Sequence, residues 1–193
     1  MSNFNIDEYR RALNHEPRVY QWLRDRGLYH SAVEKFRLGY DGSRLSIPYF
    51  DYFGRVVDVA RRSLNGGDPK YLRSGNFPFM VRSADADRVI LCEGELDTIT
   101  AHMAGYKALG IPGSECWEDE WAYLLRDCDV TIAFDGDDAG HKLTARVAKV
   151  LRLVGVDARV VDMPEGKDIN DLWVQGGKRA LSRMFGKAGT HAS

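Results

Sequence analysis

Acidic residues follow two short apolar runs of the sequence, at the point where each run ends. Residues 89–92 and 130–134 are continuous apolar stretches rich in β-branched residues, as is typical of strands buried on both faces. They lead into Glu93 and into Asp135 and Asp137. Because the carboxyl ends of parallel strands gather at one edge of a sheet, we expect these carboxylates to converge. Oxygen ligands without nearby His or Cys favour Mg²⁺ or Mn²⁺ over zinc, so the sequence predicts a divalent metal site.

Two further carboxylates extend this pattern. Asp97 stands one helical turn after Glu93, and Asp168 follows the last predicted strand, so both are candidates for additional metal ligands or supporting partners. Gly136 lets the chain pass without a side chain that would block the metal. Acidic residues after strands are also common helix caps, which makes Asp138 and Asp97 candidates for simple caps, and Asp-Gly-Asp is a common turn. Capping and turn formation are therefore the alternative interpretation.

The elements that must position these residues are predicted from periodicity. From residue 89 onward, short strands alternate with helices, which predicts a compact parallel α/β sheet flanked by helices. Residues 7–36 are predicted to form short helices, and 45–50 and 55–62 the strands of a hairpin with its turn at 51–54. We expect a small basic α+β subdomain over 1–87, the metal-binding domain over 88–175, and a C-terminal helix with a frayed tail over 176–193.

Composition limits the class of protein. The chain has 193 residues, 44% hydrophobic and 28% charged, as in soluble globular proteins. Residues 1–88 carry 15 Lys and Arg and 11 Asp and Glu, whereas residues 89–193 carry 12 Lys and Arg and 17 Asp and Glu. This difference suggests that the basic first half binds phosphates and the acidic second half holds metal. No apolar run approaches the roughly 18 residues that span a bilayer, and no signal peptide is visible, so we expect no membrane association and a cytoplasmic location. The three cysteines are expected to be reduced thiols.

Three acidic segments together resemble a known domain. Residues 93–97 (Glu-Gly-Glu-Leu-Asp), 135–140 (Asp-Gly-Asp-Asp-Ala-Gly) and 167–172 (Lys-Asp-Ile-Asn-Asp-Leu) are similar to the motifs of the Toprim domain. That domain is shared by DnaG-type primases, type IA and type II topoisomerases, OLD-type nucleases and RecR-type recombination proteins. The resemblance covers about residues 88–175 and does not by itself choose among these activities.

The first half of the chain points to one of these families. Residues 20–28, 34–40 and 47–57, and Arg62 with the segment 69–72 (Pro-Lys-Tyr-Leu), are similar to the bacterial primase catalytic core in the same order. Arg73 and residues 75–76 replace the usual Asn and Pro-Glu of that family, and from the cysteine spacing we expect no zinc ribbon in this sequence. The chain therefore resembles a DnaG-type DNA primase catalytic core, of a standalone form that a phage would encode.

The resemblance implies synthesis of short RNA primers on single-stranded DNA by metal-dependent nucleotidyl transfer. It implies Glu93, Asp135 and Asp137 as catalytic and metal-holding residues, with Asp97 and Asp168 in support. Nucleic-acid or nucleotide contacts are expected from the basic residues Arg55, Arg62, Lys70 and Arg73. The expected partners are template DNA, ribonucleoside triphosphates, and a separate zinc-bearing subunit or replicative helicase. A Toprim nuclease and a non-catalytic single-strand-binding replisome module are the alternatives.

Aromatic residues are expected mainly in the core. Tyr49, Phe50, Tyr52 and Phe53 suit the interior of the predicted hairpin, with base stacking as the alternative, and Trp22 is also expected to be buried.

Overall fold

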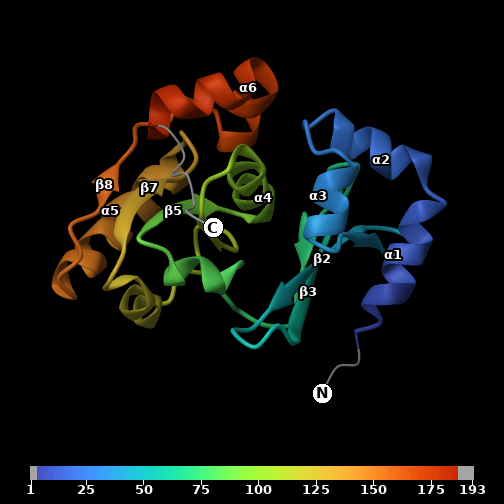
Figure 1. Ribbon diagram of the computed structural model, residues 1–193, viewed down its shortest axis with the longest axis horizontal. Helices are drawn as coiled ribbons and strands as arrows, with labels where there is room; N and C mark the ends of the chain where they lie inside the picture. Colours follow the sequence, from blue (N-terminus) through green and yellow to red (C-terminus); the bar gives the residue numbers. More distant parts are fainter. Residues whose placement is uncertain (1–3, 187–193) are drawn as a thin grey trace. The chain divides into compact units, whose positions relative to one another are not determined.

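The computed structural model of the protein describes residues 4–186, which form two compact units that divide between Phe77 and Pro78 (Figure 1). We refer to them as the N-terminal and C-terminal units. Residues 78–87 belong to the C-terminal unit, so the division lies ten residues before the position expected from the sequence. The reason is a backbone pairing within that unit, because Phe79 and Gly110 exchange both of their N–H···O bonds at 2.9 Å. Of the C-terminal helix and frayed tail expected over 176–193, residues 187–193 lie outside the described range.

The N-terminal unit combines three short helices with an antiparallel sheet. The sheet has the order β1-β2-β3-β4, and the hairpin of β2 and β3 falls where the sequence predicts it, with a bulge between Tyr49 and Phe50. Pro17 opens α2 at a position where its missing N–H is harmless. The elements are α1 (Ile6–Asn14), α2 (Pro17–Arg24), α3 (His30–Lys35), β1 (Gly39–Tyr40), β2 (Leu45–Phe50), β3 (Val56–Arg62) and β4 (Tyr71–Leu72).

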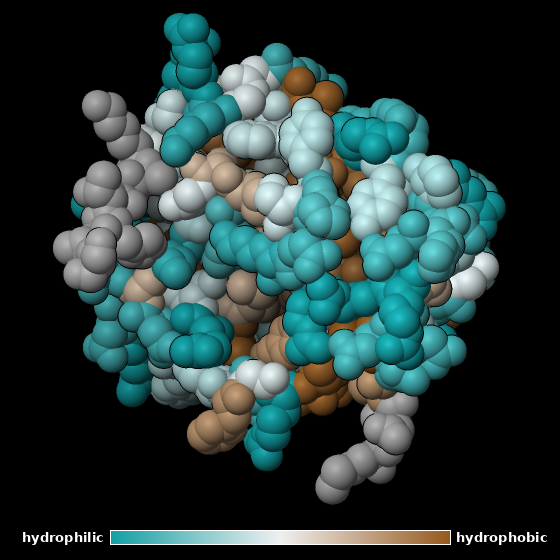
Figure 2. Space-filling view, turned by 45° about the vertical axis from the view of Figure 1, so that its right-hand side comes forward, coloured by the Kyte–Doolittle hydropathy of each residue, from teal (hydrophilic) through white to brown (hydrophobic). Residues whose placement is uncertain are grey.

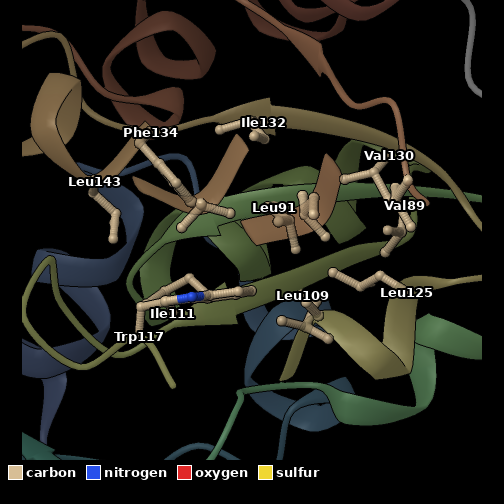
Figure 3. Packing of buried hydrophobic residues seen from close by; sticks show 14 residues of the cluster. Val89, Leu91, Leu109, Ile111, Trp117, Leu125, Val130, Ile132, Phe134 and Leu143 are labelled. Carbon is tan, nitrogen blue, oxygen red and sulfur yellow. The ribbon is translucent and has the colours of Figure 1, made fainter. Parts of the chain in front are cut away.

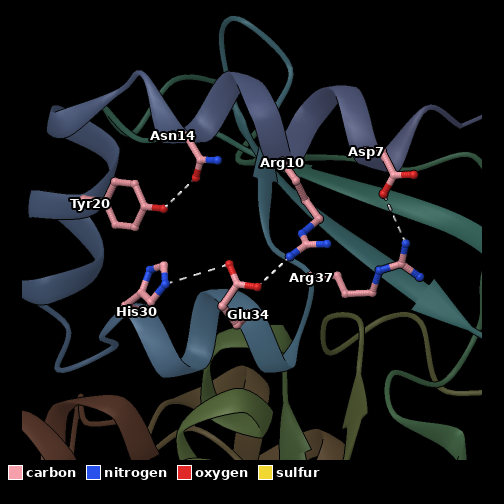
Figure 4. Close-up of polar contacts among 7 residues, drawn as sticks. All are labelled: Asp7, Arg10, Asn14, Tyr20, His30, Glu34 and Arg37. Carbon is pink, nitrogen blue, oxygen red and sulfur yellow. Dashed lines mark hydrogen bonds and ion pairs between the residues drawn. The ribbon is translucent and has the colours of Figure 1, made fainter.

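Polar contacts link the three helices at the surface of this unit (Figure 4). Arg10 of α1 pairs with Glu34 of α3 at 2.6 Å, and the Tyr20 hydroxyl of α2 donates to the Asn14 side chain of α1 at 3.2 Å. Partial burial, reinforced by the Glu34 charge, raises the pKa of Tyr20. Exposed ion pairs contribute at most about 1 kcal/mol each, so the buried apolar residues beneath them stabilise the unit.

The C-terminal unit is a parallel sheet with helices on both faces. Its strand order is β6-β5-β7-β8, and the pairings between these four strands are all parallel, which confirms the α/β class expected from the sequence. Gly177 interrupts the last helix with a non-helical backbone. The elements are η1 (Val81–Asp85), β5 (Arg88–Glu93), α4 (Glu95–Ala104), β6 (Ala108–Ile111), η2 (Asp119–Leu125), β7 (Asp129–Ala133), α5 (Asp138–Leu153), β8 (Arg159–Val160) and α6 (Ile169–Phe185).

Alternate residues of the central strand β5 face two separate apolar clusters. Val89 and Leu91 pack with α5 and η2 through residues such as Leu143 and Leu125 (Figure 3). Ile90 and Cys92 pack on the opposite face, in a cluster with residues of α4 and α6. Both faces of the strand are therefore buried, which explains why its sequence is a continuous apolar run rather than an alternating one.

Hydrophilic side chains cover most of the face seen in Figure 2. None of the helices within residues 4–186 combines the length and apolar content that crossing a membrane needs.

Candidate functional site: an acidic sheet edge and a row of guanidinium groups

Glu93 and Asp135 lie at the carboxyl ends of two neighbouring strands. Glu93 is the last residue of β5, and Asp135 comes two residues after the end of β7, which pairs with β5 in parallel. The helices that follow these strands cover opposite faces of the sheet, since α4 packs in one apolar cluster and α5 in the other. Adjacent strands whose connections leave in opposite directions form the crevice in which open α/β sheets bind ligands.

The turn from β7 into α5 fixes the backbone around Asp137. The Asp137 side chain is the N-cap of α5 and accepts the Gly140 N–H at 2.8 Å, so the cap of this helix is Asp137 and not Asp138, the residue that the sequence interpretation named. Gly140 packs so tightly that a Cβ at its position would overlap the Asp135 carbonyl oxygen. The partial positive charge of the helix N-terminus also stabilises negative charge at this turn.

Gly136 joins this turn to the segment that precedes α6. Its N–H donates to the Lys167 carbonyl at 2.9 Å, and its own carbonyl accepts the Gly166 N–H at 2.7 Å. A Cβ on Gly136 would overlap the Pro164 carbonyl oxygen. The sequence analysis explained Gly136 by the room that it leaves for a metal. It missed that a second backbone segment approaches Gly136 so closely that any side chain would overlap it.

Asp168 and Asp97 both accept backbone N–H groups at the start of α6. Asp168 caps the helix by accepting the Asp171 N–H at 2.6 Å. Asp97, buried on α4, accepts the Asn170 N–H at 2.8 Å across 73 positions of sequence. The Asn170 side chain in turn donates to the Thr100 hydroxyl of α4 at 2.9 Å. Hydrogen bonds thus join the segments that follow β5, β7 and β8 to one another.

Asn170 and Thr100 are site residues that the sequence reasoning missed. Asn170 stands in the acidic segment 167–172, but nothing in the sequence marks its partner on α4. Their bond joins residues that are 70 positions apart.

Cys92 gives an independent indication that two carboxylates lie near the end of β5. Burial is the main cause that raises the pKa of its thiol well above the ordinary value, and the negative charges of Asp97 and Asp135 raise it further. The Cys92 thiol is therefore protonated and inert at neutral pH. Cys92, Cys116 and Cys128 are all free thiols, as expected.

The donor set fits a divalent cation by its chemistry. Glu93, Asp135 and Asp137 offer carboxylate oxygens at one sheet edge, which are the ligands that Mg²⁺ and Mn²⁺ prefer. In the described part of the chain, these side chains are not gathered into a group of three or more that would enclose an ion. The structure therefore supplies the residues and the fixed backbone, and metal ligation by each of them stays a prediction.

In the N-terminal unit, guanidinium groups lie on aromatic rings. Arg26 stacks on Trp22 at 3.6 Å from the ring centroid, and Arg62 lies 5.4 Å from the same ring. The Trp22 Nε1–H donates to the Leu64 carbonyl at 2.9 Å, which fixes the ring. Trp22 is half-buried, so its expected place in the core is only partly right; Arg26 was not predicted from the sequence as a site residue.

The row continues through Tyr71 of β4. Arg62 donates to the Tyr71 hydroxyl and lies 5.0 Å from its ring, and Arg73 lies 4.6 Å from that ring. The Arg62 Nε–H is buried and makes no hydrogen bond to the described residues. We call Arg26, Trp22, Arg62, Tyr71 and Arg73 the arginine–aromatic row.

The other two predicted basic residues lie outside this row. Lys70 is exposed next to Tyr71, and its carbonyl accepts the Ser63 N–H at 2.9 Å. Arg55 lies at the β2–β3 turn, where it pairs with Asp51 at 2.7 Å. The structure therefore brings Arg62 and Arg73 together and leaves Arg55 at the opposite end of β3.

Comparison with known proteins identifies the family. A Toprim-like family model matches residues 90–173. The gene 57 protein of Mycobacterium phage D29 is 35% identical over 147 residues, which cover 71% of this chain and 94% of the phage protein. The DNA primase of Clostridium acetobutylicum is 31% identical over 172 residues, 81% of this chain. The chain belongs to the DnaG-type primase family.

The fold agrees with this assignment. A solved DnaG primase catalytic domain bound to ssDNA superposes with a TM-score of 0.80 at 22% identity, covering 92% of this chain and 74% of that domain. The chain spans only 29% of the length of the Clostridium primase. Sequence similarity thus assigns the family, and the superposition assigns the fold.

Proposed function

We propose that this chain is a primase catalytic core that synthesises short RNA primers on single-stranded DNA by divalent-metal-dependent nucleotidyl transfer. The observation that carries the proposal is the acidic edge at the β5–β7 crevice, where Glu93, Asp135 and Asp137 lie on backbone fixed by hydrogen bonds. Family membership favours primer synthesis among the activities that Toprim domains support. The similar DnaG catalytic domain was solved bound to ssDNA, which supports single-stranded DNA as the template of this chain.

Glu93, Asp135 and Asp137 would hold Mg²⁺ or Mn²⁺ at this edge. A bound divalent ion would neutralise charge on the triphosphate and orient it for displacement of pyrophosphate. Glu93 would also accept the proton of the attacking 3′-hydroxyl. Asp97 and Asp168 bind backbone N–H groups of α6, so we propose that they position this edge rather than ligate metal directly.

The arginine–aromatic row would bind phosphates of the template or of the incoming ribonucleoside triphosphate. Guanidinium groups bind phosphate in bidentate fashion, and among the described residues the buried Arg62 Nε–H meets no acceptor, a role that a phosphate oxygen would fill. Close cations repel one another, and an anion among them offsets that repulsion. Lys70 would add a mobile charge beside the row. A zinc-bearing subunit or a replicative helicase is the proposed protein partner.

The test is primer synthesis by the purified protein. Single-stranded DNA of mixed sequence and labelled ribonucleotides are incubated with Mg²⁺ or Mn²⁺, with an EDTA-treated sample beside them. Short, metal-dependent RNA products would establish the primase activity. Metal-dependent cleavage of the DNA without RNA synthesis would overturn the proposal in favour of a nuclease. DNA binding without either reaction, even after addition of a zinc-bearing primase domain or helicase, would indicate an accessory module.

A further inference from the structure

The turn that joins β2 to β3 holds an aromatic ring in solvent. Phe53 is 83% exposed, more than any other large hydrophobic side chain that the structure describes, and Tyr52 beside it is 38% exposed. The expectation that the hairpin aromatics form a core is right for Tyr49, which is 1% exposed, and wrong for Phe53. Leaving a Phe side chain in water forgoes about 1.5–3 kcal/mol of burial, which a ligand that covers the ring would recover.

Hydrogen bonds to Asp51 hold this turn in one conformation. The Asp51 carboxylate accepts the N–H groups of Phe53 and Arg55, both at 2.9 Å. The Gly54 N–H donates to the Asp51 carbonyl at 3.0 Å, and the Asp51 N–H donates to the Arg55 carbonyl at 2.9 Å. The Phe53 ring is therefore carried by a closed turn, and a ligand that contacts it would not have to order a loose loop.

Cations lie beside the aromatic rings of this hairpin. The Arg55 guanidinium is 5.1 Å from the Phe53 ring and 2.7 Å from Asp51, and the Arg55 side chain is 74% exposed. Arg37 lies 5.5 Å from the ring of Phe50 on the same hairpin. A purely apolar partner would have to desolvate Arg55, whereas a single nucleic-acid strand offers a base for the ring and a phosphate for the guanidinium.

The position of the turn makes this contact separate from the arginine–aromatic row. Arg62 stands at the far end of β3, and the six residue steps from Val56 to Arg62 span about 20 Å. A strand that contacts both ends of β3 would therefore cover several nucleotides.

We propose that Phe53 is a base-stacking residue for single-stranded nucleic acid, with Arg55 beside it contacting an adjoining phosphate. This inference rests on the proposed function, since it extends the footprint of the template strand on the N-terminal unit. Aromatic rings stack on any base, so the contact would strengthen binding without selecting sequence.

The test compares two DNA ligands and a graded set of variants by fluorescence anisotropy. One ligand is a labelled single strand of mixed sequence, and the other has the same length and phosphates but abasic sugars. Phe53→Ala should weaken binding of the base-bearing strand by about 5- to 100-fold and leave the abasic strand unchanged. Phe53→Leu, which stays apolar but is not aromatic, should behave like Phe53→Ala, and Phe53→Trp should retain binding.

Leu153→Ala is the matched control, because Leu153 is a 78% exposed apolar residue of α5 in the C-terminal unit. Wild-type affinity of Phe53→Ala for the base-bearing strand would overturn the stacking role and leave the primase proposal intact. Equal weakening on both strands, or full retention of binding by Phe53→Leu, would also overturn it, since stacking requires bases and an aromatic face. Failure of the unaltered protein to bind either strand would overturn the proposed function itself.

Discussion

The two units hold their charged side chains by different means. In the N-terminal unit, guanidinium groups rest on aromatic faces, as Arg26 does on Trp22 and Arg73 on Tyr71. In the C-terminal unit, the carboxylates of Asp137 and Asp168 accept backbone N–H groups at helix starts. Within the described residues, Arg126 over Tyr123 is the one guanidinium–ring contact of that unit.

This difference suits the partners that we propose. A ring attracts a cation through its face and leaves N–H donors of the guanidinium available for phosphate oxygens. A helix N-terminus binds a carboxylate by directed hydrogen bonds. The narrow range of distances and angles that these bonds allow fixes the backbone that carries the acidic residues. Phosphate chains vary in position, whereas a metal and its reacting groups require fixed geometry.

The largest effect is expected from removing charge at the acidic edge. Asp135→Asn and Asp137→Asn should each reduce primer synthesis about 100-fold or more, because several kcal/mol of charge stabilisation are lost. Asn caps helices as well as Asp does, so Asp137→Asn should keep the melting temperature, whereas Asp137→Ala should also lose about 1 kcal/mol of stability. Rates and thermal unfolding are measured together.

The control for these variants is Asp138→Asn, an exposed carboxylate of the same turn that accepts no capping bond in the structure. It should retain synthesis. Wild-type rates in both Asp135→Asn and Asp137→Asn would refute the assignment of the acidic edge.

The next effect is expected from the backbone that carries the acidic edge. Gly136→Ala places a methyl group on the Pro164 carbonyl, so it should destabilise folding by about 2 kcal/mol and lower synthesis without changing any charge. Denaturant unfolding measures the loss. Gly67→Ala is the matched substitution in the N-terminal unit, where the new Cβ would meet the Ser63 side chain, with its hydroxyl at 3.1 Å, and should shift stability by less than about 0.5 kcal/mol. Equal stability of the two variants would contradict the close approach at Gly136.

A smaller effect is expected in the arginine–aromatic row. Arg62→Ala should weaken binding of single-stranded DNA roughly 10-fold for all sequences and lower the slope of log affinity against log salt by about 0.7. Trp22→Leu keeps every charge, so it should weaken binding a few-fold through the loss of the ring and leave the slope unchanged. Tyr123→Leu, which removes the ring beneath Arg126, is the control. A Trp22→Leu protein that binds as tightly as the unaltered one would show that the ring does not position the guanidinium groups.

The smallest effect is expected at the Asp51 turn, on lowering the pH. Burial raises the pKa of Asp51, but hydrogen bonds from Arg55 and Phe53 and the Arg55 charge outweigh it and hold the pKa below its ordinary value of 3.8. A lowered pKa in the folded state means that the stabilisation is present above the ordinary value and is lost as the pH falls through the folded one. Titration of the Asp51 carboxyl by NMR should give a midpoint below 3.8, with the Phe53 amide signal shifting in step. A midpoint at or above that value would contradict the closed turn.

The sequence by itself determined the parallel sheet, the hairpin and the strand ends that bear Glu93 and Asp135. These are local consequences of apolar periodicity and of the abrupt change to acidic residues, so no long-range information was needed. The motif resemblance added the family, which the comparisons confirm. The sequence also indicated a cap near the start of α5, because capping is local, but it named Asp138, whereas the Asp137 side chain is the cap.

Only the tertiary structure decided which partners meet across the chain. Asp97 accepts the Asn170 N–H 73 positions away, and Gly136 is required by the Pro164 carbonyl, neither of which leaves a periodic signal. Trp22 is half-buried and carries the guanidinium groups of Arg26 and Arg62 near its ring. Phe53 lies in solvent, because a short hairpin buries one end of its aromatic run and exposes the turn. The type of a residue shows whether its side chain can stack, cap a helix or bind a ligand. Only the fold determines which other groups lie close enough for it to do so.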